Sequence, residues 1–474
     1  MQLNETQVLV MGLGVHGGGL GVSRWLIRQG ARVTVTDTAS PEALATPLAQ
    51  LEAAAAEAGT TVSYTLGGHR AEDFTRSSII IANPAVRPDS PWLALARTAG
   101  AAIESEMSLF FRRCLGPILA ITGTKGKTTT ATLLASMLRQ ARPDTVLAGN
   151  LRVSALEALD QIGPATPVVL ELSSFQLMGL GAAGLSPAYS AITNLSPDHL
   201  NYHGSMEAYA QAKQQIFAHQ GADGLLVLSA AEAEAGLLWP LAGYAGRMLT
   251  FSLEPADQAD CTIDAAGWAT LGGERLFQAA ELGRGGRHNL ANALVAAALA
   301  RSFGATPTAI GAAVRGFSGV EHRQELVAEI GGVRFVNDTT ATNPAAAITA
   351  LESIAPPIVL IAGGSDKGLP LGDLADAIVR RARAVVLLEG SATAKLAQAI
   401  AACSLQLAGS SEQLAILGPY SDFTVAIRAA YGLAKPGDTV LLSPGCASFG
   451  MFANEFQRGE EFRRIVKGLV GNRE

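Results

Sequence analysis

Residues 123–129 read GTKGKTT and lie between an apolar strand and an Ala/Leu-rich helix. This is the setting of a phosphate-binding loop, here two residues shorter than the GxxxxGK(S/T) pattern. The loop N–H groups would surround ATP phosphates, Lys127 would neutralise charge on the γ-phosphoryl group, and Thr128 would offer a hydroxyl to Mg²⁺. A surface Lys/Thr loop is the alternative. We predict an ATP site at Gly123, Thr124, Lys125, Gly126, Lys127, Thr128 and Thr129.

A second glycine-rich turn, GLGVHG at residues 12–17, also follows an apolar strand. Asp37 ends the next strand, as in the dinucleotide-binding fingerprint. Glycines let backbone N–H groups approach a pyrophosphate, and the carboxylate can accept a hydrogen bond from a ribose hydroxyl. The pattern predicts a nucleotide without naming it, and a structural tight turn remains the alternative.

Polar residues follow two further strands of the middle region. Glu171 lies in LELSSFQL, and Asp198 and His199 lie in TNLSPDHLNYHG. A carboxylate and an imidazole at strand ends could bind Mg²⁺, although this hard cation prefers oxygen ligands. A capped loop explains either motif equally well. Farther on, Arg323 in EHR could bind a phosphate through two N–H groups, or be an ordinary surface residue.

Length and composition narrow the function classes. The chain has 474 residues, of which 49% are hydrophobic and 16% charged, so we expect several packed α/β cores. A formal net charge of −6 argues against a nucleic-acid partner. No stretch of 18 apolar residues and no signal-like segment occurs, so we expect a soluble, cytoplasmic protein without membrane insertion. The four cysteines lack the paired spacing of a zinc site.

Strands alternate with helical segments in three successive series, which predicts three tandem α/β domains with largely parallel sheets. We place a Rossmann-like domain at residues 1–115, a central P-loop-type domain at 116–318 and a C-terminal Rossmann-like domain at 319–474. The predicted strands are QVLVMG, RVTVTD and SIIIAN in the first series, PILAIT, TPVVLELSS and SAITNLS in the second, and ELVAEIGGVRFVND, PIVLIAGG, AVVLLEG and DTVLLSPG in the third.

Several motifs together resemble those of the Mur ligases. They span nearly the whole chain in the family's order: GTKGKTT, LELSSFQL, SPDHLNYHGS, GRHNLANA, GVEHRQE, NDTTATN, GGSDKG and LLSPGCASF. The resemblance implies an ATP-dependent amide ligase of peptidoglycan precursor synthesis. It would add D-glutamate to UDP-N-acetylmuramoyl-L-alanine through an acyl phosphate, with ATP and two Mg²⁺ ions. We expect a monomer.

The resemblance also assigns site residues. The UDP substrate would be bound by Gly14, Val15, Asp37, Thr38, Asn83, Pro84, Asn150, Ser173 and Gln176. Further ATP contacts would come from Asn289, Asn292, Arg323 and Asp338. The catalytic set would be Lys127, Glu171, His199 and Lys213, with the metals held by Thr128, Glu171, His199 and a carbamylated Lys213. Glutamate would be bound by Thr342, Lys367, Ser448 and Phe449.

Six positions depart from the family pattern: Arg152, Asn201, Tyr202, Thr340, Gly450 and Glu455. They concern the glutamate pocket more than the ATP site. The same reaction with L-glutamate and a folylpolyglutamate synthetase-like ligase therefore stay as alternatives, although the GLGVHG turn argues against the second. The first motif alone would also suit an NAD(P)-dependent oxidoreductase, which GTKGKTT opposes. A non-catalytic nucleotide-binding scaffold is a further alternative.

Overall fold

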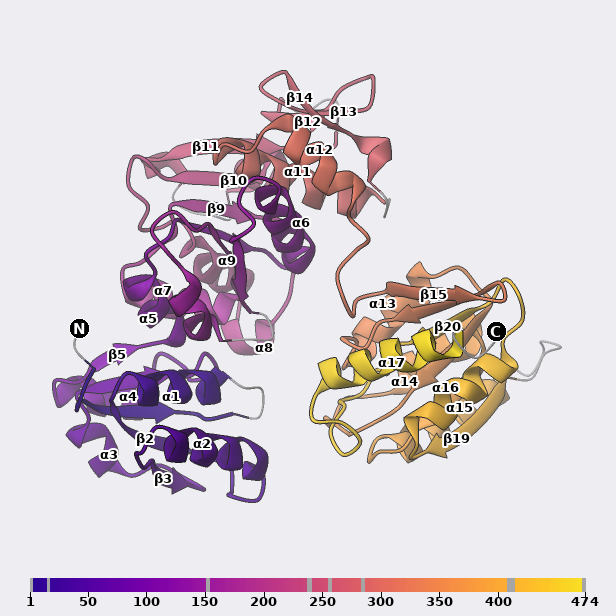
Figure 1. Ribbon diagram of the computed structural model, residues 1–474, viewed down its shortest axis with the longest axis horizontal. Coiled ribbons are helices and arrows are strands. Elements are labelled where there is room, and N and C mark those ends of the chain that lie inside the picture. The colour runs from indigo at the N-terminus through magenta and orange to yellow at the C-terminus, as the bar shows by residue number, and fades with distance from the viewer. Residues whose placement is uncertain are drawn as a thin grey trace. The chain divides into compact units, whose positions relative to one another are not determined.

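A computed structural model describes residues 3–14, 18–150, 154–236, 241–254, 258–282, 286–406 and 414–470. The chain divides into two compact units, Met1–Phe317 and Ser318–Glu474. The first unit contains two sheets and the second contains one (Figure 1). Each sheet is mainly parallel and is flanked by helices, which confirms the predicted α/β class.

The first sheet is wholly parallel, with the order β3-β2-β1-β4-β5. The chain leaves β1 toward β2 on one side, whereas β4 pairs with its other side. Ligands of open parallel sheets bind at the carboxyl end of such a reversal. The elements are β1 (Gln7–Met11), α1 (Gly18–Arg28), β2 (Arg32–Asp37), α2 (Ala45–Glu57), β3 (Ser63–Leu66), α3 (Ala71–Arg76), β4 (Ile79–Ala82), α4 (Pro91–Thr98), β5 (Ala102–Glu104) and α5 (Glu106–Arg113).

The second sheet has nine strands, in the order β14-β13-β12-β11-β10-β9-β6-β8-β7. Its first part comprises β6 (Ile118–Thr122), α6 (Lys127–Arg139), β7 (Val146–Gly149), η1 (Ala155–Gln161), β8 (Val168–Glu171), α7 (Ser174–Ala182), β9 (Tyr189–Ile192), α8 (Leu200–His203) and α9 (Met206–Gln214). Its second part comprises β10 (Leu225–Ser229), α10 (Ala230–Ala235), η2 (Leu241–Gly243), β11 (Arg247–Phe251), β12 (Cys261–Ile263), β13 (Trp268–Leu271), β14 (Glu274–Gln278), η3 (Ala279–Glu281), α11 (Arg287–Ser302) and α12 (Pro307–Arg315).

Two features of this sheet bear on the site. Strand β6 pairs in parallel with β8 and β9, so the loops that follow all three strands meet at one edge. Strands β13 and β14 run antiparallel at the far edge, and the sequence analysis did not predict them. They are short and only partly buried, so they lack the continuous apolar run that marks a central parallel strand.

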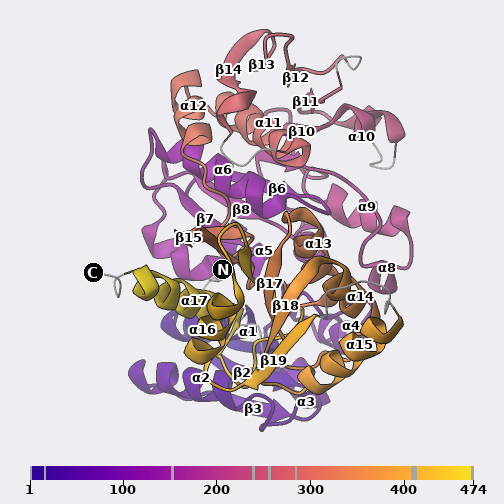
Figure 2. The ribbon, with the colours of Figure 1, turned by 90° about the vertical axis from the view of Figure 1, so that its right-hand side faces the viewer.

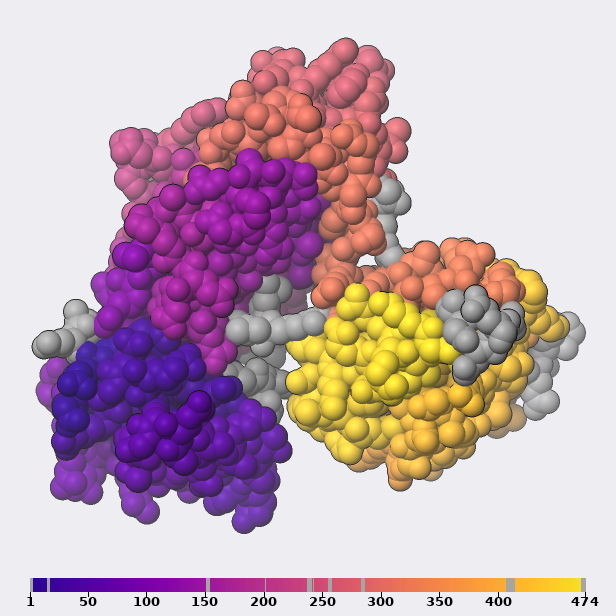
Figure 3. Space-filling view, viewed as in Figure 1, coloured from indigo at the N-terminus to yellow at the C-terminus, as the bar shows by residue number. Residues whose placement is uncertain are grey.

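The first and second sheets share a hydrophobic core. One buried cluster includes Trp25 of α1, Phe110 of α5, Leu156 of η1 and Leu177 of α7. In the space-filling view, the N-terminal segment lies directly against the middle segment (Figure 3). This shared core explains why both sheets belong to one compact unit.

The third sheet has the order β15-β16-β20-β17-β18-β19 and is parallel except for β15. The segment ELVAEIGGVRFVND, predicted as a single strand, is instead the antiparallel pair β15 and β16, because Gly331 and Gly332 adopt positive φ and form a turn between them. Helices α16 and α17 cover one face, and α13, α14 and α15 the other (Figure 2). The elements are β15 (Glu325–Ile330), β16 (Val333–Asn337), α13 (Pro344–Ser353), β17 (Ile358–Ala362), α14 (Gly372–Arg381), β18 (Ala382–Leu388), α15 (Thr393–Gln406), β19 (Ala415–Tyr420), α16 (Phe423–Leu433), β20 (Thr439–Leu442) and α17 (Glu455–Val470).

The sequence analysis also named no strand at β3, β5, β7, β10, β11 or β12. Strand β19 was missed as well. It is an edge strand, its residues are mostly exposed and it contains Pro419, so neither its apolar content nor its composition marks it. Among the described residues, no helix is both long and apolar enough to span a membrane.

Candidate functional site

The loop between β6 and α6 is shaped by two glycines. Gly126 caps α6 with φ +82°, and a Cβ there would lie 2.2 Å from Asn292 Oδ1. Gly123 has φ +145°, and a Cβ there would lie 1.9 Å from Thr193 Oγ1. Larger residues are excluded at both positions, so the bare backbone approaches the N-terminus of α6, where N–H groups and the helix dipole favour phosphate.

Residues after β9 brace the same loop. Asn194 Oδ1 accepts from the Lys125 N–H at 2.9 Å, and Thr193 Oγ1 donates to the Lys125 carbonyl at 2.6 Å. The sequence analysis missed both residues. Their position directly after the predicted strand SAITNLS, at the carboxyl edge it shares with residues 123–129, is the signal that could have identified them.

Lys127 and Lys213 converge on this loop. Lys127 Nζ donates to the carbonyls of Gly123 and Thr124, at 3.0 and 2.9 Å. Lys213 Nζ donates to the Gly123 carbonyl at 2.8 Å and lies 4.6 Å from the centre of the Tyr209 ring. Lys213 is only 1% exposed. Burial, and next the charge of Lys127, lower the pKa of Lys213 from 10.5 to about 7.

Glu171 ends β8 at the same edge of the sheet. Its Oε1 accepts from Asn150 Nδ2 at 3.1 Å, whereas its Oε2 is buried and has no hydrogen-bond partner among the described residues. An unpartnered buried carboxylate oxygen is costly unless a cation balances it. Glu171 and Asp198 both act electrostatically on Lys213, so the structure brings these groups near one another. These observations fit a divalent cation beside Glu171.

The described residues hold no group of three His, Cys, Asp or Glu side chains able to bind a metal. A cation beside Glu171 would therefore need other oxygen ligands, such as the Thr128 hydroxyl or a modified Lys213. His199 directly precedes α8 and has φ +52°, its imidazole is about half exposed, and it packs on Phe175 with ring centres 5.2 Å apart. No hydrogen bond joins it to Glu171 in the described structure.

His203, which the sequence analysis did not select, is more closely tied to this region. Its Nε2 lies 3.1 Å from Ser174 Oγ, and its ring packs against Phe175 and Tyr209. Burial, followed by the charges of His199 and Lys213, lowers its pKa. The four-residue spacing from His199 in SPDHLNYHG is the signal that could have identified it.

Tyr202, one of the departures from the family pattern, packs on Phe175, and the Arg87 guanidinium lies 5.5 Å from its ring centre. The Asn201 side chain and Arg152 lie outside the described residues.

Asn150, one of the residues predicted to bind the UDP substrate, donates to Glu171. Ser173 and Gln176 form the capping box of α7, with Ser173 Oγ accepting from the Gln176 N–H and Gln176 Oε1 accepting from the Ser173 N–H.

The first-domain turn is organised around Asp37. Its Oδ2 accepts from the N–H groups of Leu13 and Gly14, at 2.9 and 3.2 Å, and its Oδ1 accepts from Ala39. Asn83 lies on the other side, where Nδ2 donates to the Gly12 carbonyl at 3.4 Å. The Asp37 carboxylate therefore holds the backbone of the turn through these hydrogen bonds. A hydrogen bond from a ribose hydroxyl would use the lone pairs of the carboxylate that the N–H groups leave free. Thr38 and Pro84 adjoin these two residues at the surface, whereas Val15 lies outside the described residues.

In the second unit, Asp338 is buried at the end of β16. Its Oδ1 accepts from the Gln324 N–H at 3.1 Å and its Oδ2 from Ser443 Oγ at 2.8 Å. Burial raises the pKa of Asp338 to about 7, although these hydrogen bonds and Arg323 oppose the shift. Arg323 is exposed beside it. Asn289 lies in the first turn of α11 in the other unit.

The residues predicted to bind glutamate lie around two neighbouring loops. Lys367 Nζ donates to Thr342 Oγ1 at 3.2 Å, and both line a small pocket that also includes Cys446. Ser448 is buried, and its Oγ has no hydrogen-bond partner among the described residues. Ser365 links the two loops by donating to the Phe449 carbonyl. The structure therefore places the Lys367 cation beside the Thr342 hydroxyl, and both are groups that can bind a carboxylate.

Comparisons with known proteins cover nearly the whole chain. Residues 6–105 match the Mur ligase MurD-like N-terminal domain, residues 121–300 the Mur ligase middle domain, and residues 322–446 the Mur ligase, glutamate ligase domain. The UDP-N-acetylmuramoylalanine–D-glutamate ligase of Roseiflexus sp. (strain RS-1) is 51% identical, over 99% of this chain and 100% of that protein. The ligase of the same name from Pelotomaculum thermopropionicum is 36% identical, over 98% of each chain.

Solved structures share the fold at low identity. The UDP-N-acetylmuramate–alanine ligase of Thermotoga maritima has a TM-score of 0.58 and 21% identity, over 98% of this chain and 100% of that one. The MurF ligase of Thermotoga maritima, solved in complex with ADP, has a TM-score of 0.53 and 17% identity, over 100% of this chain and 96% of that one. These neighbours confirm the predicted three-domain α/β fold.

Proposed function

This chain belongs to the Mur ligase family, and we propose that it joins D-glutamate to UDP-N-acetylmuramoyl-L-alanine with conversion of ATP to ADP and phosphate. The observation that carries the proposal is the full-length identity of 51% to the UDP-N-acetylmuramoylalanine–D-glutamate ligase of Roseiflexus sp. (strain RS-1). The glycine-shaped loop at Gly123 and Gly126, with Lys127 at the start of α6, supports the ATP requirement. An enzyme using these substrates would work in the cytoplasm.

In the proposed reaction, a carboxylate oxygen of the alanyl group attacks the γ-phosphorus, which gives an acyl phosphate and ADP. The amine of glutamate then attacks the acyl carbon and loses a proton, and the tetrahedral intermediate expels phosphate to leave an amide. Lys127 would exchange its loop carbonyls for the phosphoryl oxygens and stabilise their charge as the transfer proceeds. The loop N–H groups would hold the phosphates in line for attack.

Two Mg²⁺ ions are proposed beside Thr128, Glu171, His199 and Lys213, and they would supply charge neutralisation on the phosphates. Glu171 suits this role because its buried Oε2 lacks a protein partner in the described structure. Lys213 suits carbamylation because a pKa of about 7 leaves much of its amine neutral near neutral pH. The neutral amine would add to CO₂ and release a proton, which replaces a buried cation with an anionic oxygen ligand.

We assign the UDP substrate to the first domain, 1–115, ATP to the central domain, 116–318, and glutamate to the C-terminal domain, 319–474. By the family match, Arg323 and Asp338 would contact ATP, and we propose that the domains close during the reaction. Glutamate would be held by Lys367 and the hydroxyls of Thr342 and Ser448. We expect the enzyme to act as a monomer.

A phosphate-release assay tests the proposal. It uses UDP-N-acetylmuramoyl-L-alanine and ATP with D-glutamate, L-glutamate, D-aspartate or L-aspartate in separate reactions. Phosphate release with D-glutamate alone is the expected result. Release only with L-glutamate would replace the proposed substrate, and no release with any of the four would overturn the proposed reaction. Calorimetric titration with UDP and with NADH separates the ligase from an oxidoreductase.

A further inference from the structure

Residues 321–324 form a tight turn directly before β15, and two of its residues adopt an unfavourable backbone conformation. His322 has φ +63° and Gln324 has φ +46°, both in the left-handed region. A residue with a Cβ remains there only when its surroundings hold it. Arg323 lies between the two, and its N–H donates to the Val320 carbonyl at 3.2 Å. The direction of Arg323 therefore depends on the contacts made by its neighbours.

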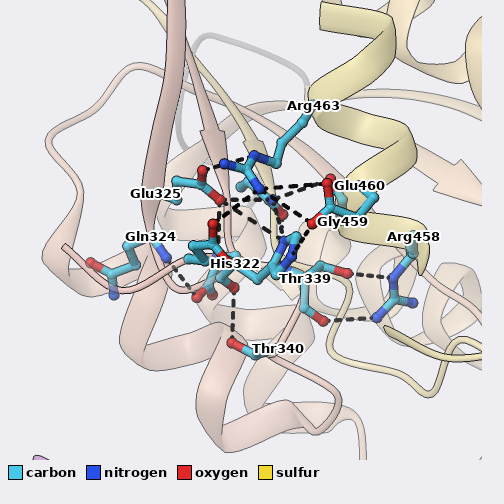
Figure 4. A network of polar contacts seen from close by, with 12 residues as sticks. His322, Gln324, Glu325, Thr339, Thr340, Arg458, Gly459, Glu460 and Arg463 are labelled. Carbon is cyan, nitrogen blue, oxygen red and sulfur yellow. Dashed lines mark hydrogen bonds and ion pairs between the residues drawn. The ribbon is translucent and has the colours of Figure 1, made fainter. Parts of the chain in front are cut away.

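The imidazole of His322 is fully buried and joins β16 to α17 (Figure 4). Its Nδ1 lies 2.9 Å from Asn337 Nδ2, and its Nε2 lies 3.0 Å from Glu460 Oε1. An amide nitrogen can only donate, so Nδ1 accepts and Nε2 carries the proton that is donated to Glu460. Both ring nitrogens are therefore engaged, one by the strand and the other by the helix.

Helix α17 comes close to this ring because residue 459 is glycine. A Cβ at Gly459 would lie 2.2 Å from His322 Nδ1 and 2.6 Å from Thr339 Cγ2. The Gly459 carbonyl also accepts from Asn337 Nδ2 at 3.3 Å. One residue earlier, the buried Arg458 donates to the hydroxyl and the carbonyl of Thr339, both at 2.9 Å. The helix is thus fixed to the segment that follows β16.

The backbone of the turn is fixed by the same groups. The His322 N–H donates to Glu325 Oε2 at 2.8 Å, and its carbonyl accepts from Thr340 Oγ1 at 2.9 Å. The Gln324 N–H donates to Asp338 Oδ1 at 3.1 Å. Arg463 of α17 completes the network, with its Nε 3.0 Å from Glu325 Oε1. The turn that presents Arg323 and one oxygen of Asp338 are therefore parts of a single network anchored on α17.

We propose that α17 positions Arg323 and Asp338 for the nucleoside triphosphate, with Glu460 and His322 acting as positioning residues that do not touch the substrate. This rests on the proposed function, which assigns Arg323 and Asp338 to ATP. When the acceptor at residue 460 is lost, the ring loses its helix-side partner and the two left-handed residues can relax. Arg323 then spends less time in the orientation that reaches phosphate.

The first test measures amide hydrogen exchange of the turn in the full chain, without substrate. His322→Ala would remove a buried ring and disturb folding, so the test uses Glu460→Ala, with Glu460→Gln keeping the acceptor oxygen. Glu461→Ala is the control, because Glu461 pairs only with Arg464 on the same helix in the described structure. Exchange at His322 and Gln324 is expected to become about tenfold faster in Glu460→Ala and to stay near wild type in the other two. Unchanged exchange in Glu460→Ala would overturn the proposal.

The second test measures kcat and the KM for ATP in a double-mutant cycle with Arg323→Ala. Glu460→Ala should lower kcat about tenfold when Arg323 is present and have little effect when Arg323 is absent. Glu460→Gln should recover most of the loss. Equal losses in both backgrounds would show a general structural effect and overturn the proposal. An inactive wild type would instead count against the proposed function, and hydrogen exchange would still decide whether α17 holds the turn.

Discussion

Lys127 and Lys213 donate to the same backbone oxygen, the carbonyl of Gly123, at 3.0 and 2.8 Å. Two ammonium groups that share one acceptor repel each other, and the charge of Lys127 is the second cause of the lowered pKa of Lys213, after burial. Lys127 is the cation that we propose to bind phosphate, and its charge makes the neutral form of Lys213 more accessible. This relationship motivates the first two predictions.

Lys127→Ala should reduce kcat by about 10³-fold or more, because it removes the charge proposed to stabilise the phosphoryl group in transfer. Steady-state release of ADP or phosphate measures the effect. Gln140→Ala, an exposed change at the other end of α6, is the control and should leave kcat near wild type. Near-normal turnover in Lys127→Ala would refute the proposed role.

Lys213 should make stability depend on pH when it is unmodified. Its pKa is about 7 in the folded protein against 10.5 in the unfolded chain, so the unfolded chain binds more protons between those values. The free energy of unfolding should therefore rise from about pH 7 to 10.5, by at most about 1.4 kcal/mol per pH unit. Urea unfolding in CO₂-free buffer measures this rise. Lys213→Met should flatten it, and an equal rise in both proteins would exclude Lys213 as its source.

Asp338 should show the opposite dependence. Its pKa is about 7 when folded against 3.8 in the unfolded chain, so the folded protein binds more protons between those values. Its contribution to stability should be complete below about pH 4 and be lost as pH rises through 7. Asp338→Asn can keep the contacts to Gln324 and Ser443, so it should melt no lower than wild type at pH 8 while kcat falls at least about tenfold. A lower melting temperature at pH 8 would contradict this account.

Gly126→Ala should impair ATP binding and also destabilise the first unit. Its φ of +82° disfavours a side chain, and the new Cβ would meet Asn292 Oδ1 at 2.2 Å. Gly184→Ala is the matched control, since its φ is +69° and nothing lies within 4 Å of its Cβ position. The control should lose about 1 kcal/mol through backbone strain alone. Gly126→Ala should lose more, and calorimetry with an ATP analogue should give weaker binding only there.

Glu171→Gln should raise the Mg²⁺ concentration needed for half-maximal activity without lowering the stability of the metal-free protein. The unpartnered Oε2 makes the buried carboxylate costly when no cation is present, and an amide removes that charge while it can still accept from Asn150. Activity measured against Mg²⁺ concentration, together with thermal unfolding in chelator, tests both parts. An unchanged Mg²⁺ requirement would exclude Glu171 as a ligand.

Much of the architecture could be predicted from the sequence. Buried parallel strands must be apolar along their whole length, so QVLVM, VVLE, IVLIA and TVLL stood out, and the glycines before α6 indicated a loop with special backbone angles. Strand β19 did not stand out, because an exposed edge strand with a proline leaves no such pattern. The short antiparallel strands β13 and β14 were missed because they are only partly buried. Strand β10, LLVLS, was also not named, although it is apolar and buried.

The order of motifs along the chain determined the family and the residue types available for catalysis. The tertiary structure alone decided which of those groups meet. Lys213 lies 86 residues after Lys127 in the sequence, yet both reach the Gly123 carbonyl, because β6, β8 and β9 end at one edge of a sheet. Glu460 lies more than one hundred residues after His322, yet α17 packs its Gly459 on that imidazole. Pairings of this kind, and the pKa values they set, depend on burial and distance, which a linear pattern does not contain.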